Sequence, residues 1–245
     1  MIQIAVLVSG AFAGGFVSGL AGFGTGLIAL GIWLYVVPPS VAVPLVVICS
    51  VVSQTSTLPT VWRFIEPRLV WPFLVGGLIG VPLGTMLITL VDPRAFKLGV
   101  GLVLLVFPAI LYLNPRPLAL KIGGRSADTA IGFAGGMLGG LAGLSGPIPT
   151  LWASVRGWGK DQRRGVFQAF NWTMLTYALC LQTGTGLITD QVVRFALLAL
   201  PGTIFGAWLG ARTYQVLSDK HFHNVVLALL FLSGSVLVCS NLYAR

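Results

Sequence analysis

Long apolar runs without charge restrict what this chain can fold into. Residues 2–37 carry no charged side chain. Six further uncharged runs cover 40–62, 69–91, 98–113, 165–189, 195–211 and 224–244. Because about 20 apolar residues in a helix cross the hydrocarbon core of a bilayer, several runs are long enough to span it. Only 9% of the 245 residues are charged, against about 25% in soluble domains. We therefore expect an all-α polytopic membrane protein.

The net charge of +9 is explained by membrane topology, and no nucleic-acid partner is expected. Basic residues concentrate in short loops that stay on the cytoplasmic side. The three cysteines lie within apolar segments and lack metal-ligand spacing. The acidic residues and histidines lie at predicted segment ends or in loops, and no nucleophile–base set stands out. We therefore expect no metal, no cofactor and no enzymatic activity.

One glycine-rich phrase occurs twice. "AGGFVSGLAGFGTG" begins at Ala13 and "AGGMLGGLAGLSGP" at Ala134, and seven of their fourteen positions agree at an offset of 121 residues. A second glycine pattern repeats at an offset of 126: Gly76, Gly80 and Gly84 recur as Gly202, Gly206 and Gly210. Such stripes let neighbouring helices approach closely in lipid. The chain therefore divides into two membrane repeats, 1–114 and 129–245, joined by the connector 115–128.

Each repeat is predicted to contain a glycine-broken helix pair followed by three transmembrane helices. The second pair, 129–142 and 147–155, has arms of 9–14 residues. Such arms span only about half of a core about 30 Å thick, so this pair is expected to be a re-entrant hairpin with its turn near the midplane. The first pair, 2–21 and 27–37, has longer arms. It could be re-entrant or fully spanning.

The two repeats are expected to have inverted topology. A hairpin returns the chain to its starting side and three helices then cross, so each repeat makes an odd number of crossings. With both termini outside, eleven basic residues lie on the cytoplasmic side, the connector included. They are Arg63, Arg68, Arg116, Lys121, Arg125, Arg156, Lys160, Arg163, Arg164, Arg212 and Lys220. Arg94, Lys97, Arg194 and Arg245 lie outside, which agrees with the positive-inside rule.

The two glycine turns are the candidate substrate site. Broken helices of inverted repeats place helix N-termini near the midplane, where their unpaired N–H groups and partial positive charge favour anions. Thr25 and Ser145 add hydroxyl donors, and Pro147 presets the first turn of its helix. Four glycines would let a ligand reach the backbone: Gly22, Gly24, Gly26 and Gly146. The alternative is that the glycines serve helix packing alone.

The segments that follow the hairpins are unusually polar for buried helices. "CSVVSQTSTLPT" begins at Cys49 and "FQAFNWTMLTYALCLQT" at Phe167. They could supply polar ligands to the site, among them Gln54, Gln168 and Asn171. Side chains of this kind also link helices in membranes, and the sequence favours neither role. An anion exporter needs no proton relay, because an inside-negative potential drives anions outward by about 2.3 kcal/mol per charge per 100 mV.

Several stretches resemble the TauE/SafE family of membrane permeases. They include "GFVSGLAGFGTGLIAL", "VAVPLVVICSVVSQ", "GVPLG" and "GGLAGLSGPIPTLWASVRGWGKDQRRGVFQAFN". The resemblance covers nearly the whole chain and implies export of sulfite or organosulfonates across a bacterial inner membrane. The matching motif positions are Gly22, Gly24, Gly26, Ser145, Gly146, Pro147 and Arg164, the last expected at the cytoplasmic entrance. Many members carry a further glycine where this chain has Thr25.

Together these features predict a secondary transporter that exports a small sulfur-containing anion by alternating access. Three alternatives stay open: a passive anion channel, an uptake permease for a related anion, and a membrane subunit that passes its ligand to a soluble enzyme. The glycine stripes could pack within one chain or between two, so a homodimer is also open. Besides the small anionic substrate, the lipid bilayer is the only partner that the sequence requires.

Overall fold

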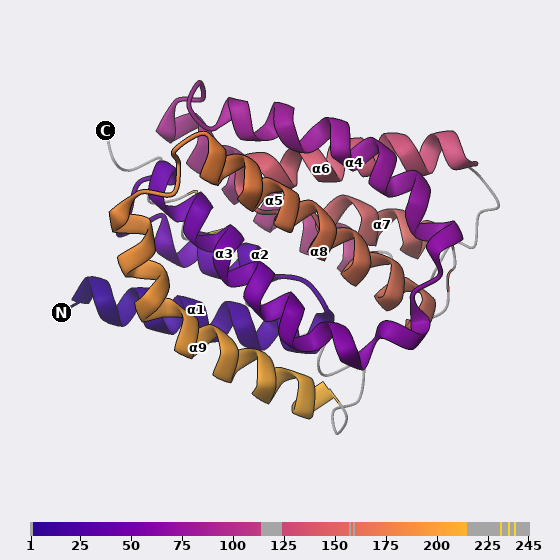
Figure 1. Cartoon of the computed structure of the whole chain (residues 1–245), viewed down its shortest axis with the longest axis horizontal. Coiled ribbons are helices and arrows are strands. Elements are labelled where there is room, and N and C mark those ends of the chain that lie inside the picture. The colour runs from indigo at the N-terminus through magenta and orange to yellow at the C-terminus, as the bar shows by residue number, and fades with distance from the viewer. Residues whose placement is uncertain are drawn as a thin grey trace.

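A computed structural model gives the structure of the chain and describes residues 2–113, 124–156, 158, 160–214, 231, 235 and 238 (Figure 1). All regular structure in these ranges is helical. The helices are α1 Ile2–Ala21, α2 Thr25–Trp33, α3 Pro39–Thr57, α4 Pro67–Leu87, α5 Pro93–Leu113, α6 Arg125–Ala142, α7 Pro147–Val155, α8 Lys160–Gly184 and α9 Asp190–Tyr214, with short 3₁₀ turns η1 Leu58–Thr60 and η2 Trp62–Phe64 between α3 and α4.

Four of these helices are long and apolar enough to cross a membrane. They are Ile2–Ala21, Pro39–Thr60, Pro67–Leu87 and Asp190–Thr213. The prediction of an all-α polytopic membrane protein is therefore confirmed. α8 has 25 residues but is too polar to count among the four. It packs against α3, α4, α6 and α7, and its polar residues Gln168, Asn171 and Gln182 are buried among them.

Proline and aspartate define several helix starts. Pro39, Pro67 and Pro147 are the first residues of α3, α4 and α7, where a fixed φ and a missing N–H cost nothing. Asp92 precedes α5, and its Oδ1 accepts hydrogen bonds from the N–H groups of Arg94 at 2.9 Å and Ala95 at 3.0 Å. This side chain therefore caps the α5 N-terminus.

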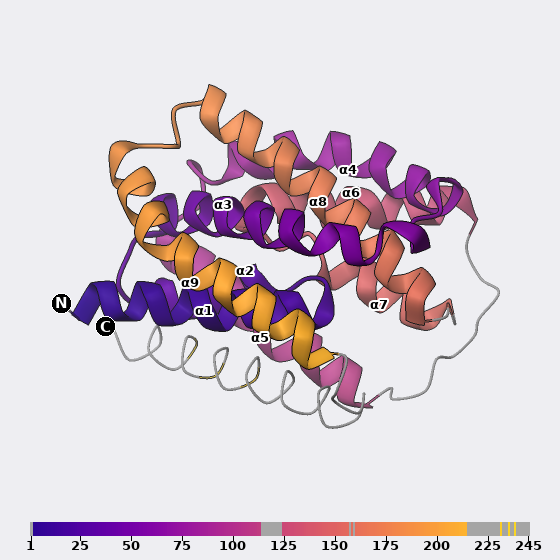
Figure 2. The same cartoon turned by 60° about the horizontal axis from the view of Figure 1, so that its bottom comes forward.

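Two helical hairpins enter the bundle from opposite ends (Figure 2). α1 and α2 enter from the end that holds the N-terminus, and α6 and α7 enter from the other end. α2 and α7 have nine residues each, which corresponds to about 14 Å at 1.5 Å per residue. The two hairpins therefore share one form, in which a short second arm cannot cross the bilayer.

The observed helix bounds differ from the predicted ones at a few positions. α2 begins at Thr25, two residues before its predicted start, and its last helical residue is Trp33. α6 begins at Arg125, so the last four residues of the predicted connector are helical. The predicted final span, 224–244, lies outside the described residues except for isolated positions.

The glycine stripe of α4 contacts α6 directly. A Cβ atom at Gly76, Gly80 or Gly84 would collide with the carbonyl oxygens of Thr129, Phe133 and Met137 respectively. α6 carries a matching stripe, because a Cβ at Gly132, Gly136 or Gly140 would collide with the α4 backbone. Two bare faces thus pack backbone against backbone, as small-residue motifs allow in membranes.

α1 and α9 repeat this arrangement. A Cβ at Gly206 or Gly210 would meet the carbonyl oxygens of Phe12 and Phe16. In return, Gly15 and Gly19 of α1 lie against the backbone of α9. The predicted packing role of both glycine stripes is confirmed. Because these contacts lie inside one chain, the stripes offer no argument for a homodimer, which stays an untested prediction.

Candidate functional site

Each hairpin turns at a glycine in the left-handed conformation. Gly22 follows α1 with φ of 77°, and Gly143 follows α6 with φ of 67°. Their N–H groups close the helix ends by donating to Ser18 O at 2.8 Å and Gly139 O at 2.9 Å. A side chain is strained at such φ values. The two turn glycines are 121 positions apart, so the repeated phrase forms the same turn twice.

The tips of the two hairpins touch. A Cβ at Gly26 would lie 2.7 Å from the carbonyl oxygen of Gly143. A Cβ at Gly146 would lie 2.8 Å from the Phe23 ring. Gly24, which lies between Phe23 and Gly26 in the first turn, has φ of 113°. Glycine is therefore required where the broken segments meet, and this contact brings the N-termini of α2 and α7 to one place.

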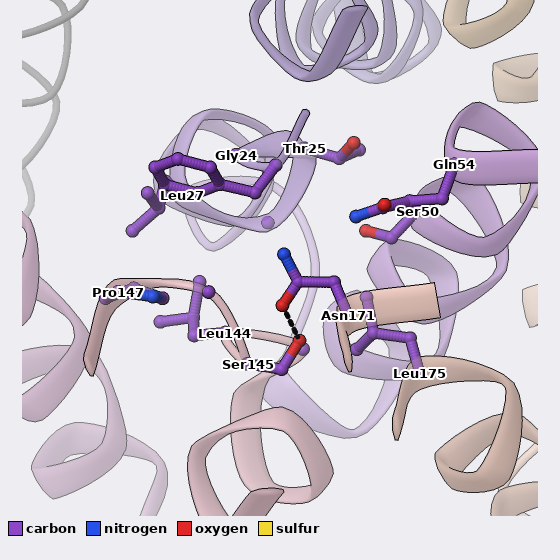
Figure 3. A pocket seen from close by; sticks show the side chains of 14 residues that line it. Gly24, Thr25, Leu27, Ser50, Gln54, Leu144, Ser145, Pro147, Asn171 and Leu175 are labelled. Carbon is purple, nitrogen blue, oxygen red and sulfur yellow. Dashed lines mark hydrogen bonds between the residues drawn. The ribbon is translucent and has the colours of Figure 1, made fainter. Parts of the chain in front are cut away.

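A small pocket lies at this meeting point, bounded by both hairpins, α3 and α8 (Figure 3). Its lining consists of Phe23, Gly24, Thr25, Gly26, Leu27, Ser50, Gln54, Gly143, Leu144, Ser145, Gly146, Pro147, Asn171 and Leu175. Eight of the ten predicted substrate-site residues are among them. No lining residue carries a charge. The open space is about 10 Å³, which is room for about one water molecule.

The polar side chains of the pocket have hydrogen-bonding capacity to spare. The Ser145 hydroxyl donates to Asn171 Oδ1 at 2.8 Å, and Asn171 Nδ2 has no partner among the described residues. The hydroxyls of Thr25 and Ser50 are likewise buried without a partner. Figure 3 shows these groups and the Gln54 amide around the same space. Buried polar groups are nearly always satisfied, so this cluster is a candidate binding site.

The short second arms of the hairpins, α2 and α7, differ in how many backbone N–H donors they can offer the pocket. Neither α2 nor α7 has a side-chain cap. The first residues of α2 are Thr25, Gly26 and Leu27, whose N–H groups have no intrahelical acceptor. α7 begins Pro-Ile-Pro, so Pro147 and Pro149 supply no N–H. The backbone donors of the site therefore come mainly from α2.

The remaining predicted residues lie next to the pocket and not in its lining. Gln168 Nε2 donates to Thr57 Oγ1 at 2.6 Å and thereby links α8 to α3. A Cβ at Gly22 would lie 3.3 Å from Gln168 Oε1 and 3.6 Å from Arg164 Cγ. Arg164 Nη2 makes a long contact of 3.5 Å with Gly19 O, at the α1 C-terminus, where a cation is favourable. Arg164 thus reaches the first hairpin from the start of α8.

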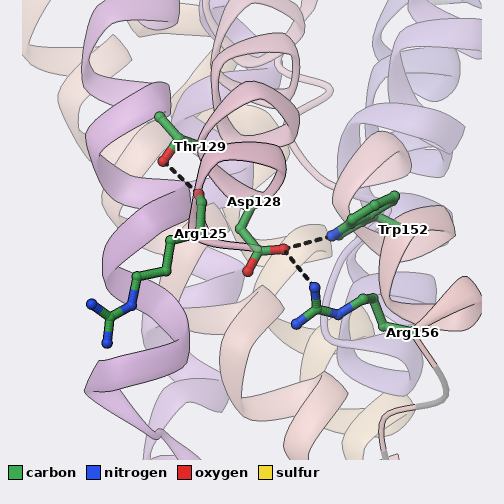
Figure 4. A network of polar contacts seen from close by, with 5 residues as sticks. All are labelled: Arg125, Asp128, Thr129, Trp152 and Arg156. Carbon is green, nitrogen blue, oxygen red and sulfur yellow. Dashed lines mark hydrogen bonds and ion pairs between the residues drawn. The ribbon is translucent and has the colours of Figure 1, made fainter. Parts of the chain in front are cut away.

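Sequence reasoning missed a polar cluster at the open end of the second hairpin. Asp128, in the first turn of α6, is buried. Its Oδ1 accepts a hydrogen bond from Trp152 Nε1 at 2.7 Å and lies 3.8 Å from Arg156 Nη1. Trp152 lies in the second half of α7, and Arg156 directly follows its last residue (Figure 4). The cluster therefore joins the two arms of the hairpin. The residue types, an acid, an indole and a guanidinium, are compatible with such a cluster, but their spacing in the sequence gives no sign that they meet.

Comparison with known proteins identifies the family. The family model described as sulfite exporter TauE/SafE matches residues 6–237, which is nearly the whole chain and includes both hairpins, α3 and α8. No match was found among functionally curated proteins or among solved structures. Members of this family are transporters and not enzymes. The chain therefore belongs to the TauE/SafE family of membrane transporters.

Proposed function

We propose that this protein exports a small sulfur-containing anion, sulfite or an organosulfonate, and binds it in the pocket between the hairpin tips. The observation that carries the proposal is the set of unpartnered polar groups there. Asn171 Nδ2 and the hydroxyls of Thr25 and Ser50 are buried without partners, and all three residues line the pocket. An oxyanion would accept hydrogen bonds from each of them.

The electrostatics of the pocket favour an anion over a cation. Cation sites usually include carboxylate ligands, and the lining contains no carboxylate. The N-terminus of α2 adds free N–H groups and about half a positive charge. Arg164 lies near the first turn without entering the pocket. It would attract anions to the site without pairing with them there.

The pocket also supports the proposed inverted repeat of 1–114 and 129–245. Ser50 and Asn171, which both line it, are 121 positions apart. The same offset relates Gln54 to Leu175 and Thr25 to Gly146. Equivalent positions of the two halves thus meet around one centre. A two-fold axis in the membrane plane produces this arrangement in transporters with broken helices.

A tryptophan in each hairpin supports the same repeat. Trp33 Nε1 donates to Leu7 O at 3.0 Å, which links α2 to α1. Trp152 Nε1 donates to Asp128 Oδ1 at 2.7 Å, which links α7 to α6. Leu7 and Asp128 are again 121 positions apart. The second arm of each hairpin is therefore joined to the first through equivalent acceptor positions, although the two tryptophans are 119 positions apart and the acceptors differ chemically.

The basic residues support an orientation in the inner membrane with the N-terminus outside. Among the described residues, three lie at the end of the bundle where α5 and α9 begin: Arg94, Lys97 and Arg194. Eight lie toward the other end, where α4, α6 and α8 begin: Arg63, Arg68, Arg125, Arg156, Lys160, Arg163, Arg164 and Arg212. The more basic end belongs in the cytoplasm by the positive-inside rule. An inside-negative potential then favours anion efflux.

The size of the pocket supports alternating access. Sulfite and organosulfonates are larger than the single water molecule that the open space admits. Binding therefore requires the hairpin tips, which touch at Gly26–Gly143 and Phe23–Gly146, to separate. A rocking movement of one repeat against the other would open the pocket to one side of the membrane at a time.

The test is anion efflux from proteoliposomes loaded with sulfite, sulfoacetate, taurine or sulfate, with the potential set by a potassium gradient. We expect saturable efflux of one sulfur anion that accelerates when the inside is negative. The test variant carries Thr25→Val and Ser145→Ala. It should fold like the wild type but transport the anion more slowly. The proposal fails if this variant transports with unchanged flux and affinity.

Other outcomes would replace the proposed mechanism. Ohmic currents without saturation or trans-stimulation would identify a channel that uses the same pocket. Movement only toward the inside, under any potential, would identify an uptake permease. If no sulfur anion moves under any potential or pH gradient, the substrate class is wrong.

A further inference from the structure

A second and much larger groove lies outside the pocket at the hairpin tips, between α4, α8, the 3₁₀ turns η1 and η2, and the first residue of α6. Its open space is about 620 Å³, which is in the range of small-molecule sites. It is lined by Leu58, Trp62, Ile65, Pro67, Arg68, Val70, Trp71, Leu74, Arg125, Ala169, Trp172 and Thr173. None of these residues lines the pocket at the hairpin tips. We propose that the groove binds an anionic phospholipid of the cytoplasmic leaflet.

Two arginines make the rim of the groove positive. Arg68 is the second residue of α4 and Arg125 the first of α6, and the glycine-mediated packing of these helices brings both to one end. Both side chains are exposed. Figure 4 shows Arg125 projecting away from Asp128, over the neighbouring helix. The rim therefore gathers charge from two helices at one point.

Among the described residues, the two rim arginines make no ion pair with the acids near them, although the Glu66 carboxylate lies only two positions before Arg68. Asp128 pairs with Arg156, and Glu66 Oε1 accepts a hydrogen bond from Gln162 Nε2 at 3.1 Å. Within the described ranges, neither Arg68 nor Arg125 has an ion pair. Both also occupy the first turn of a helix, where the helix dipole disfavours a cation. A bound phosphate would offset both unfavourable charges and could pair with each guanidinium.

The rest of the groove is apolar and aromatic. Trp62 and Trp71 are 67% and 63% exposed, and Trp172 lies on the α8 side, where its Nε1 donates to Thr55 Oγ1 at 3.0 Å. Tryptophan is enriched at the level of lipid headgroups. Val70 and Leu74 continue the lining along α4, away from the arginines.

This combination selects one kind of occupant. A soluble anion would use the arginines but not the apolar floor, and a neutral lipid would use the floor but not the arginines. An anionic phospholipid uses both, with its phosphate on Arg68 and Arg125 and an acyl chain along Leu74. Basic pockets between helices at the cytoplasmic face bind such headgroups. This lipid-binding proposal is independent of the proposed transport function, because it uses only the residues of the groove.

The experiment is native mass spectrometry of detergent-solubilised protein titrated with phosphatidylglycerol or phosphatidylcholine of equal chain length. We expect at least one retained phosphatidylglycerol and about a tenfold preference over phosphatidylcholine. Arg68→Gln with Arg125→Gln should abolish the preference. The matched control, Arg94→Gln with Lys97→Gln, removes the same charge at the start of α5 and should keep it.

A second variant tests the floor independently of charge. Leu74→Trp keeps both arginines and fills the path of the acyl chain, so retention of either lipid should fall about tenfold. In a separate competition with the wild-type protein, an excess of glycerol phosphate should not displace the bound lipid. Equal binding of the two lipids by the wild type, or unchanged phosphatidylglycerol binding in both the arginine and Leu74 variants, would overturn the proposal.

Discussion

The Ser145 hydroxyl donates a hydrogen bond of 2.8 Å to Asn171 Oδ1 and so connects the second hairpin turn to α8. Both residues are buried. The bond fixes the rotamer of the asparagine amide, because its oxygen is used on the hairpin side. Its Nδ2 is then left as a donor with no partner among the described residues, next to the N-terminus of α2. The turn therefore positions a donor that belongs to another helix.

Asn171→Asp is expected to abolish anion transport while keeping the fold. The carboxylate can still accept the Ser145 hydrogen bond, but it replaces the Nδ2 donor with negative charge. Two like charges about 4 Å apart repel by about 4 kcal/mol at an effective dielectric constant of 20, so affinity should fall at least about a hundredfold. Concentration-dependent efflux from proteoliposomes measures this. Asn171→Ala, which only removes the donor, should lose less anion affinity than Asn171→Asp. Equal affinity in the wild type and both variants would exclude Asn171 from the site.

Thr25→Val and Ser50→Ala are expected to weaken substrate binding without weakening the fold. Both hydroxyls are buried with no hydrogen-bond partner, so their removal breaks no bond in the empty protein. Loss of a hydrogen bond to a charged ligand costs about 1.5–3 kcal/mol, which raises the KM about tenfold or more. The measurements are thermal unfolding in detergent and the KM of efflux. A lower unfolding temperature with unchanged KM would assign these hydroxyls to helix packing.

The turns and the helix packing were predictable from sequence because glycine is required there for local reasons. Gly22 and Gly143 adopt positive φ, and the glycine stripes meet backbone atoms of a neighbouring helix. Neither requirement depends on knowing the whole fold. A repeated glycine phrase therefore predicts a repeated turn, although not which helices the stripes contact.

The pocket lining was less predictable because it depends on helix rotation. Gln168 and Asn171 are three residues apart on α8, yet Asn171 lines the pocket and Gln168 bonds to Thr57 beside it. Both are polar, so residue type does not separate them. From sequence, Asp128 is predicted only to lie at the end of a segment. That α7 returns Trp152 and Arg156 to it depends on the length of the hairpin arms.

Gly136→Ala is expected to destabilise the protein, whereas Gly99→Ala is not. A Cβ at Gly136 would lie 2.6 Å from Gly77 Cα, while one at Gly99 of α5 meets nothing within 4 Å. Overpacking of this kind costs about 1–3 kcal/mol, and about 1 kcal/mol lowers Tm by about 2–4 °C in a chain of this size. Thermal unfolding of both variants in the same detergent checks this. Equal Tm values would show that α4 and α6 can separate freely.

Asp128→Ala is expected to loosen the second hairpin more than Asp128→Asn. Alanine removes both the acceptor of the Trp152 indole and the counter-ion of Arg156, whereas asparagine keeps an acceptor oxygen. A buried group left unsatisfied costs about 1–3 kcal/mol, and a partly exposed ion pair alone about 1 kcal/mol or less. Thermal unfolding followed by tryptophan fluorescence compares the two. If both variants lose equal stability, the ion pair and not the indole hydrogen bond holds the hairpin arms together.

A disulfide between the hairpin tips is expected to stop transport reversibly. A Cβ at Gly146 would lie 2.8 Å from the Phe23 ring, so Phe23→Cys with Gly146→Cys places two thiols across the contact that alternating access must open. The three native cysteines, Cys49, Cys180 and Cys239, are replaced by serine in the same protein to prevent side reactions. Oxidation should abolish efflux and a reductant should restore it, while each single-cysteine variant stays active in both conditions. Efflux that continues through the oxidised, cross-linked protein would mean that the anion passes without separation of the tips, as in a channel.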